Sequence, residues 1–505
     1  MKVLLINPSV PRDVPQSVRA EHRYDPPLAA LYLGSFLARN GIESEILDTV
    51  IDEIDLEKVK NNEYDLVSFT VFIGEFQKKA RELAGAIKAV NPKVPVVFGG
   101  VMASIFPQEF LEEYPADYII RYEGENTLYE LVLSLEGKMD TSHINGLSYK
   151  KGSEIFHNPP RYLEKNLDTF PVPMWELLGA GCNIHQVPYY YSIMTSKGCP
   201  FRCSFCYNRQ VEDDIQADSP TWRFRSAEHV IAEISSIHAI TGTRVFTFGD
   251  DNFLVNRERA ISILDYFRKN QFYIEQCVGH MNNFNSPELI SAMGGVVQTG
   301  IYALESASPR LLQLLQKNLR IDRVPEVNKR LFEKGITTIH TFIVGLPTET
   351  DTDLAMNVSL MKELKSANPF VRGQPYLYLP LPHTPLESYI RETMGFDLPH
   401  SLRYYENARF EFDGGEKYRP WIDADRYALL RDYVEIFRDL FQINNLAVSE
   451  KTIVTLEENP RLKKIFGDVS AINKPHEKYL PYVLDRVLRN EVIDLEHDLG
   501  KRVKG

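Results

Sequence analysis

The sequence predicts an α/β protein of several folded parts, because short apolar strands alternate with amphipathic helices over the first 400 residues. We expect an open, doubly wound parallel sheet at residues 1–140 and a connector at 141–184. A partial (β/α)6 barrel is expected at 185–400 and a helical region at 401–505. Many expected strands stop at Gly, Pro, Asn or Asp, which are turn residues. A chain of 505 residues is long enough for two or three domains.

The composition is that of an ordinary globular protein, and it excludes several functions. Charged residues make up 25% and hydrophobic residues 44%. No stretch approaches the roughly 20 apolar residues that a membrane span requires. The net charge of −12 argues against sequence-independent binding of nucleic acid. Five cysteines in so long a chain do not form a disulfide framework, so we expect a cytoplasmic enzyme without a membrane span.

The first 140 residues carry five expected strands, and ligands of such sheets bind at the carboxyl ends of the strands. The strands are expected at Val3–Ile6, Glu43–Leu47, Leu66–Phe72, Val94–Phe98 and Tyr118–Arg121. Helices are expected at Leu28–Ala38, ended by Gly41, and at Phe76–Val90. The strand ends carry Asn7-Pro8, Ser68 to Phe72, Gly99-Gly100-Val101 and Glu123-Gly124.

Six further strand–helix units predict the barrel, whose reactive groups would lie at the carboxyl ends of its strands. The strands are expected at Tyr190–Thr195, Val245–Phe248, Cys277–His280, Gly300–Leu304, Thr337–Val344 and Tyr376–Leu379. The last hundred residues predict one helix with an apolar face from Tyr427 to Phe441 and another at Pro481–Leu495. We expect the aromatic residues of the first to pack on the barrel, with a lid over the substrate as the alternative.

Three of the five cysteines, Cys199, Cys203 and Cys206, lie within eight residues directly after the first barrel strand. Thiolates this close together are soft ligands suited to zinc, copper(I) or an iron–sulfur cluster. Three ligands are one fewer than a closed tetrahedral site needs, so an iron cluster here keeps one iron open. A zinc knuckle with a distant fourth ligand and a buried disulfide are the alternatives.

The spacing Cys-x3-Cys-x2-Cys, with an aromatic residue before the last cysteine, resembles the signature of the radical S-adenosylmethionine (SAM) superfamily. The resemblance implies a [4Fe-4S] cluster on the three cysteines, with SAM on the open iron. It also implies SAM contacts at matching positions: Phe205 and Tyr207, Asp250 and Asp251 at the amino group, Glu305 at the ribose, and Ile343, Val344 and Gly345 at the adenine. A helix cap, a buried ion pair and a plain turn are the respective alternatives for Asp250-Asp251, Glu305 and Gly345.

The N-terminal layout resembles the cobalamin-binding domain that precedes many radical SAM domains. Matching features are Pro26-Pro27 before the first helix, the glycine pair after strand four and Glu-Gly-Glu-x-Thr after strand five. The resemblance implies cobalamin contacts from the strand ends: Asn7, Pro8, Ser68, Thr70, Val71, Gly99, Gly100, Val101, Glu123, Gly124 and Thr127. The first loop lacks the Asp-x-His-x-x-Gly motif, so cobalamin would bind without a histidine as lower ligand.

Together the two resemblances imply a cobalamin-dependent radical SAM methyltransferase. In such an enzyme a 5′-deoxyadenosyl radical takes hydrogen from an unactivated carbon, which then receives a methyl group from methylcobalamin. A ferredoxin or flavodoxin would supply electrons, and the substrate class stays open. The alternatives are a radical SAM enzyme that performs cyclisation, coupling or rearrangement, with or without cobalamin, and a zinc-stabilised binding protein without catalysis.

Several remaining residues near barrel strand ends have both a structural and a functional interpretation. Cys182 and Cys277 are expected to be small core residues. Substrate contact is the alternative for Cys277. His280 and His340 are expected to be structural, with substrate contact or proton transfer as the alternative. For Tyr376 and Tyr378 the sequence does not decide between packing and substrate contact.

Overall fold

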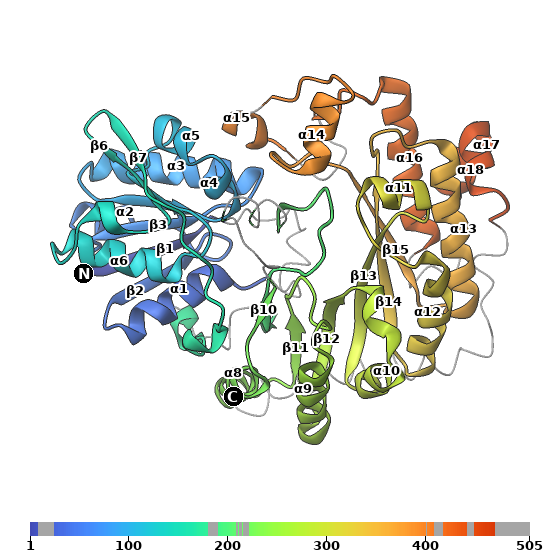
Figure 1. Cartoon of the computed structure of the whole chain (residues 1–505), viewed down its shortest axis with the longest axis horizontal. Helices are drawn as coiled ribbons and strands as arrows, with labels where there is room; N and C mark the ends of the chain where they lie inside the picture. The colour runs from blue at the N-terminus through green and yellow to red at the C-terminus, as the bar shows by residue number, and fades with distance from the viewer. Residues whose placement is uncertain are drawn as a thin grey trace.

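Two large sheets organise the protein, one in the N-terminal domain and one in the barrel (Figure 1). A short antiparallel pair, β9 (Ser196–Lys197) and β10 (Arg223–Phe224), forms a third sheet. The computed structural model describes residues 1–8, 25–179, 190–208, 211, 215, 222–399, 401–408, 418–441 and 449–469. Cys182 and the expected helix at Pro481–Leu495 lie outside these ranges. No helix in the described part of the chain is both long and apolar enough to cross a membrane.

The N-terminal sheet has the strand order β2-β1-β3-β4-β5-β6-β7, and its first five strands are parallel. The strands are β1 (Lys2–Asn7), β2 (Glu43–Asp48), β3 (Leu66–Thr70), β4 (Val96–Gly99), β5 (Tyr118–Ile120), β6 (Leu147–Lys151) and β7 (Glu154–His157). The predicted doubly wound domain is therefore confirmed. The antiparallel hairpin β6–β7, turned at Gly152 with φ +65°, was not predicted.

Helices cover both faces of this sheet because successive residues of β1 point to opposite sides. Val3 and Leu5 pack in one core with α1 and α6, whereas Leu4 and Ile6 pack in the other with α3. The helices are α1 (Leu28–Arg39), α2 (Leu56–Lys60), α3 (Glu75–Val90), α4 (Val101–Ile105), α5 (Pro107–Glu113) and α6 (Glu125–Leu135).

The barrel sheet contains six parallel strands in the order β15-β14-β13-β12-β11-β8, which confirms the partial barrel. The strands are β8 (Ser192–Ile193), β11 (Val245–Phe248), β12 (Tyr273–Gly279), β13 (Val297–Glu305), β14 (Thr337–Val344) and β15 (Arg372–Leu377). The predicted Tyr376–Leu379 strand was wrong in its bounds. Pro375 lies within β15, which tolerates it because β15 is an edge strand.

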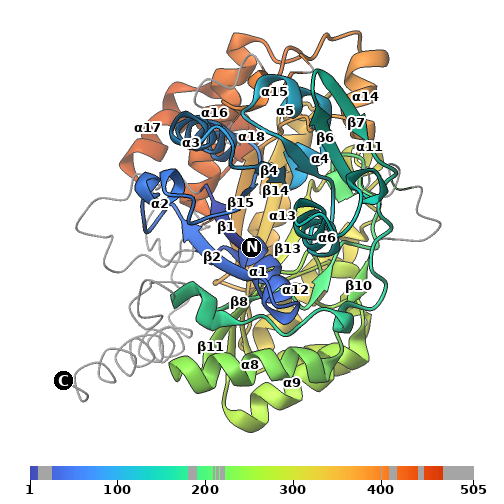
Figure 2. The same ribbon diagram turned by 90° about the vertical axis from the view of Figure 1, so that its left-hand side faces the viewer.

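The barrel helices and most of the later helices cover the outside of the barrel sheet (Figure 1), whereas the helix at Leu402–Tyr405 lies beside α5 of the N-terminal domain (Figure 2). The barrel helices are α8 (Ala227–Thr241), α9 (Arg257–Asn270), α10 (Pro287–Met293), α11 (Pro309–Leu314), α12 (Val324–Glu333) and α13 (Asp351–Ala367). The later helices are α14 (Pro385–Glu392), α15 (Leu402–Tyr405), α16 (Ala424–Leu440), α17 (Glu450–Glu458) and α18 (Pro460–Phe466). Phe437 of α16 meets Phe342 of β14 with ring centroids 5.4 Å apart, so α16 packs on the barrel as expected.

Candidate functional site

The cysteine loop, residues 198–207, is fixed at its start by a buried carboxylate. Asp250, just after β11, accepts hydrogen bonds from the backbone N–H groups of Thr195 and Ser196 and from the Thr195 hydroxyl, each at 2.6 Å. Both of its oxygens are engaged, and the residue is 1% exposed. These bonds direct the chain out of the sheet after β8 and into the loop.

The middle of the loop is anchored to two other segments of the barrel. The backbone N–H of Ser204 donates to the Leu315 carbonyl and its hydroxyl donates to the Leu314 carbonyl, both at 2.9 Å. The N–H of Leu386 in turn donates to the Ser204 carbonyl at 2.9 Å. The loop is therefore held at two points, with the three cysteines around the second.

The three thiols lie in an environment that disfavours thiolate unless a cation is present. Cys203 is buried, and Cys199 and Cys206 are half-buried. Burial raises the pKa of Cys199 to about 11 and that of Cys206 to about 12, and the nearby Asp251 carboxylate adds to both shifts. A metal beside the sulfurs reverses this balance, because its positive charge stabilises thiolate.

The three cysteines match the ligand set of a [4Fe-4S] cluster in the chemistry of their donor atoms. One zinc ion requires its ligands to converge at about 2.0–2.3 Å. The cysteines of a [4Fe-4S] cluster bind separate irons, so thiols spaced around one loop fit that group.

Of the two predicted aspartates, Asp251 is the one beside the cysteine loop. Its carboxylate accepts a hydrogen bond from the Asn208 side chain at 3.0 Å, and burial raises its pKa. The charge of Asp251 also raises the pKa values of Cys206 and Tyr207, whose main cause is burial. An acceptor-only group at this place suits the ammonium of SAM. The carboxylate oxygens of Asp250 instead accept hydrogen bonds from Thr195 and Ser196.

Glu305 lies at the end of β13 with φ +65°, and it forms a buried ion pair. Its carboxylate lies 2.9 Å from Nζ of Lys317, and the two side chains are 8% and 5% exposed. The Lys317 charge acts on Cys199 and Cys203, so this pair adjoins the cysteine loop. A ribose contact for Glu305 stays a prediction. Lys317 was not predicted because it follows a short helix, whereas reactive groups were expected at the ends of strands.

The turn after β14 brings together part of the predicted adenine site. Phe205 and Ile343 pack against one small core cluster, whereas the neighbouring Val344 is buried in the main barrel core. Gly345 has φ +75°, and its N–H donates to the Glu349 carboxylate at 2.8 Å. The turn is therefore held closed by Glu349, which the sequence did not single out.

The predicted substrate contacts separate into two groups in the structure. Cys277 and His340 are fully buried, and Cys277 belongs to the core between the barrel sheet and its helices. Tyr378 is also buried, 3% exposed, whereas Tyr376 is 36% exposed. The His280 ring stacks on Phe201 of the cysteine loop with centroids 3.9 Å apart. Only Tyr376 and His280 thus have an exposed position or a contact with the loop.

The strand ends of the N-terminal domain are partly accessible. Among the predicted cobalamin contacts, Pro8, Ser68, Val71 and Thr127 are buried, whereas Asn7, Thr70, Gly99, Gly100, Val101, Glu123 and Gly124 are half-buried. Gly100 has φ +94°, and a Cβ there would lie 2.5 Å from the Val71 carbonyl, so only glycine fits. Phe72, which the sequence placed at this strand end, and Phe76 are 45% and 39% exposed and present apolar rings beside this edge, but neither was predicted as a cobalamin contact. Backbone close to the edge and accessible aromatic rings suit a large, flat cofactor.

The two domains are joined at the cysteine loop by a cluster of charges. Lys197, directly before the loop, pairs with Glu125 at 2.6 Å and lies 3.5 Å from Glu123. Glu123 also pairs with Arg223 at 2.8 Å. The Glu-Gly-Glu turn of the N-terminal domain therefore holds the barrel, a role that the sequence did not predict. A cobalamin contact for Glu123 stays a prediction.

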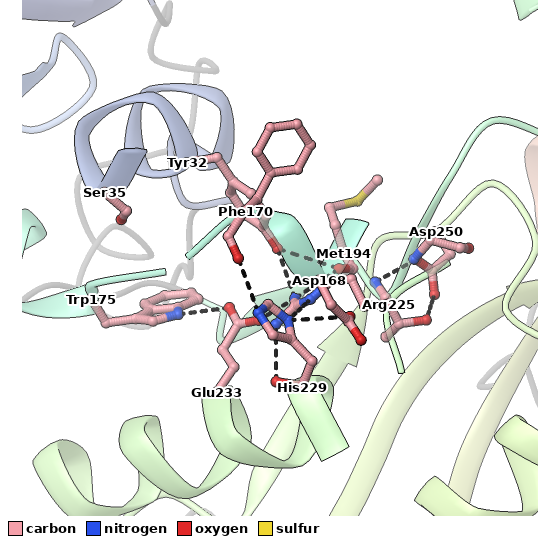
Figure 3. A network of polar contacts seen from close by, with 12 residues as sticks. Tyr32, Ser35, Asp168, Phe170, Trp175, Met194, Arg225, His229, Glu233 and Asp250 are labelled. Atoms are coloured by element: carbon pink, nitrogen blue, oxygen red, sulfur yellow. Dashed lines mark hydrogen bonds and ion pairs between the residues drawn. The ribbon is translucent and has the colours of Figure 1, made fainter. Parts of the chain in front are cut away.

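A second polar network links helix α1 to the barrel (Figure 3). Arg225 donates to the Tyr32 hydroxyl at 3.2 Å and to the Met194 carbonyl at 3.0 Å, and it forms a buried ion pair with Glu233. Trp175 of the connector donates to Glu233 at 2.9 Å. The network ends on the segment between β8 and the cysteine loop, because the Arg225 N–H donates to the Thr195 carbonyl at 3.0 Å.

On the opposite side, α3 and α5 of the N-terminal domain contact the segment around α15. The Gly74 N–H donates to the Tyr405 carbonyl at 3.1 Å, and Arg81 pairs with Glu406 at 2.7 Å. The carboxyl-end turns of the N-terminal sheet thus face the barrel mouth from two sides. A partial barrel with a three-cysteine loop, covered by a doubly wound domain, defines a class of enzyme. In this class each of the two domains binds its own cofactors.

Comparison with known proteins identifies that class. The B12 binding domain family matches residues 19–132, and the Radical SAM superfamily matches residues 193–361. An uncharacterized methyltransferase, PH0819 of Pyrococcus horikoshii, is 31% identical over 72% of this chain and 78% of its own length. The anaerobic magnesium-protoporphyrin IX monomethyl ester cyclase of Synechocystis is 25% identical over 51% of each chain. The chain belongs to the radical SAM superfamily, in the group with an N-terminal B12-binding domain.

A solved structure has the same fold. The radical SAM methyltransferase TsrM of Kitasatospora setae, with tryptophan substrate and a SAM analog bound, has a TM-score of 0.66 and 21% identity. The match covers 86% of this chain and 89% of that one. The protein is thus a radical SAM enzyme whose cofactors are a [4Fe-4S] cluster, SAM and cobalamin, and the zinc-binding alternative is wrong.

Proposed function

We propose that the enzyme transfers a methyl group through cobalamin to an unactivated carbon of its substrate. When bound, the cluster and SAM supply a radical that abstracts hydrogen, and cobalamin carries the methyl group. The observation that carries the proposal is the joint between the two domains. The ion pair between Lys197 and Glu125 supports the proposal, because it brings the cysteine loop next to the strand ends of the B12-binding domain.

The chain's own residues support this chemistry by positioning and by limiting access of water. Asp250 fixes the start of the cysteine loop, and the α15 contacts and the Arg225 network join the domains on two sides. Burial of reactive intermediates prevents side reactions with solvent. Proton transfer by His280 is not part of the proposal, because burial lowers the pKa of His280 to about 3.

Product stoichiometry tests the proposal. Enzyme reconstituted anaerobically with iron, sulfide and cobalamin should form S-adenosylhomocysteine together with 5′-deoxyadenosine, and the product should gain one methyl group by mass spectrometry. Cys203→Ala should abolish 5′-deoxyadenosine formation because it removes a ligand of the cluster. Formation of 5′-deoxyadenosine without S-adenosylhomocysteine would instead favour a cyclisation or rearrangement, a second candidate that the similarity to the cyclase supports.

The substrate and the reductant belong to the same proposal. The substrate class stays open, and a cytoplasmic ferredoxin or flavodoxin is the expected electron donor. Candidate compounds can be screened by their effect on S-adenosylhomocysteine formation. With a true substrate, S-adenosylhomocysteine and 5′-deoxyadenosine should form together.

A further inference from the structure

A groove with an unusual charge lies between η4 (Met281–Asn285) and helix α12. It encloses about 480 Å³ and is lined by Met281 and Phe284 on one wall and by Arg320, Arg323 and Arg330 on the other. None of these arginines belongs to the cofactor site described above. Guanidinium groups grouped in one groove favour carboxylate or phosphate ligands, which they bind through paired hydrogen bonds.

The positive charge of this groove contrasts with the net charge of −12 of the whole chain. Glu326 is the one carboxylate in the lining. Asp322 pairs with Arg320 at 2.8 Å, but both side chains are 61% exposed, so water screens that pair. Arg330 forms no ion pair with any residue in the described ranges. With three arginines and one glutamate, the described lining has a net positive formal charge.

One wall of the groove leads directly to the cysteine loop. Met281 follows His280, whose ring stacks on Phe201 at 3.9 Å. Phe201 lies between two of the cysteines in the sequence. A single pair of stacked rings therefore connects the groove wall to the loop that holds the cluster.

The opposite wall reaches the same loop through Lys317. The Asn282 side chain donates to the Asn318 carbonyl at 2.5 Å and joins the two walls. Asn318 follows Lys317, which forms the buried pair with Glu305 beside the cysteines. Both walls of this basic groove thus end at the candidate cluster site.

We propose that the groove, lined by Arg320, Arg323 and Arg330, is the docking surface for an acidic one-electron carrier protein of the flavin or iron–sulfur type. The proposal rests on the proposed function, because it concerns the electron that cleaves SAM. The reduced carrier loses one electron and the cluster gains it, so the step balances without another reactant. Carboxylates on the carrier meet the arginines, and the opposite charges speed association at low salt.

Binding of a purified flavodoxin to the full chain tests the proposal without requiring turnover. The triple variant Arg320→Glu, Arg323→Glu, Arg330→Glu should weaken flavodoxin binding at least about tenfold at low salt and flatten its salt dependence. Lys329→Glu is the matched control, because Lys329 is exposed on the same helix outside the groove. It should change the affinity less than about twofold.

Chemical reduction separates this proposal from the proposed function. With dithionite as reductant, the triple variant should cleave SAM at the wild-type rate, whereas with reduced flavodoxin it should be slower by at least about tenfold. Equal flavodoxin affinity of the triple variant and wild type would overturn the docking surface, as would an equal loss in Lys329→Glu. Saturable binding of inorganic phosphate in the groove, without any effect of the variant on flavodoxin affinity, would indicate a small-anion site instead. A wild-type enzyme that cleaves no SAM with dithionite would contradict the proposed function, while the binding data still decide the docking surface.

Discussion

Substitution of Asp250 should loosen the entry to the cysteine loop. Asp250→Ala removes three hydrogen bonds of 2.6 Å, from Thr195 and Ser196, in a fully buried place. Hydrogen bonds to a charged group contribute about 1.5–3 kcal/mol each, but such losses do not add fully. Loss of a buried charged partner costs about 3–5 kcal/mol in total, and we expect a local destabilisation of that size.

The conservative variant should have a smaller effect for a geometric reason. Asp250→Asn keeps one oxygen, Oδ1, which accepts from both backbone N–H groups. It loses the charge that faces Arg259 and the second oxygen that accepts from the Thr195 hydroxyl. We therefore expect about 1–2 kcal/mol for Asp250→Asn.

Amide hydrogen exchange measures this effect at the right place, because a multi-domain chain does not unfold in one step. Exchange at the Thr195 and Ser196 amides should accelerate roughly 100-fold or more in Asp250→Ala, since 1.4 kcal/mol corresponds to a factor of ten. Asp251→Asn is the matched control and should leave these amides within about threefold of wild type, because they bond to Asp250, whereas the Asp251 carboxylate accepts from Asn208. Unchanged exchange in Asp250→Ala, or equal acceleration in Asp251→Asn, would refute the assigned role.

Three further predictions follow from other contacts. Gly100→Ala should destabilise the N-terminal domain by more than the roughly 1 kcal/mol expected for Gly137→Ala. Both glycines have positive φ, but only at Gly100 would the Cβ meet backbone, so equal thermal midpoints would contradict the steric argument. Burial raises the pKa of Glu349 to about 7, so the folded protein holds this proton while the unfolded chain releases it near pH 4.5. Stability should therefore fall as pH rises from about 4.5 to about 7, and Glu349→Gln should lack that fall when thermal midpoints are compared across pH. Lys197→Met should leave Glu125 buried without its cation and lower iron content after reconstitution, whereas Lys138→Met, at an exposed pair, should not; equal iron content in both variants would count against the joint.

The sequence was sufficient for the existence of the parallel strands because most are short apolar runs bounded by turn residues, and for the cysteine loop because its spacing is local. Side-chain direction at the strand ends of the N-terminal sheet was not predictable in the same way. Its strands are buried on both faces, so Ser68 and Val71 show no polar–apolar alternation that would reveal their burial. The hairpin β6–β7 was missed because its strands mix apolar with polar and charged residues and form no continuous apolar run.

Pairs of interacting residues that are far apart in the sequence were also not predictable. Lys197 and Glu125 are separated by 72 residues, and Tyr32 and Arg225 by 193. Neither pair has a local pattern, because each forms only when two domains pack together. Glu305 and Lys317 are closer in sequence, but a left-handed backbone at Glu305 and the intervening helix α11 bring them together.

The position of the cysteine loop explains why the Glu-Gly-Glu turn has two different uses in one structure. Its backbone stands at the carboxyl edge of the N-terminal sheet, where ligands of such sheets bind. Its carboxylates instead reach Lys197 and Arg223 on the barrel side. Since Lys197 is two residues before Cys199, a ligand that shifts this turn also shifts the charge next to the first cysteine. The loop is therefore anchored to the barrel through Asp250 and to the B12-binding domain through Lys197. Its geometry depends on both domains being in place.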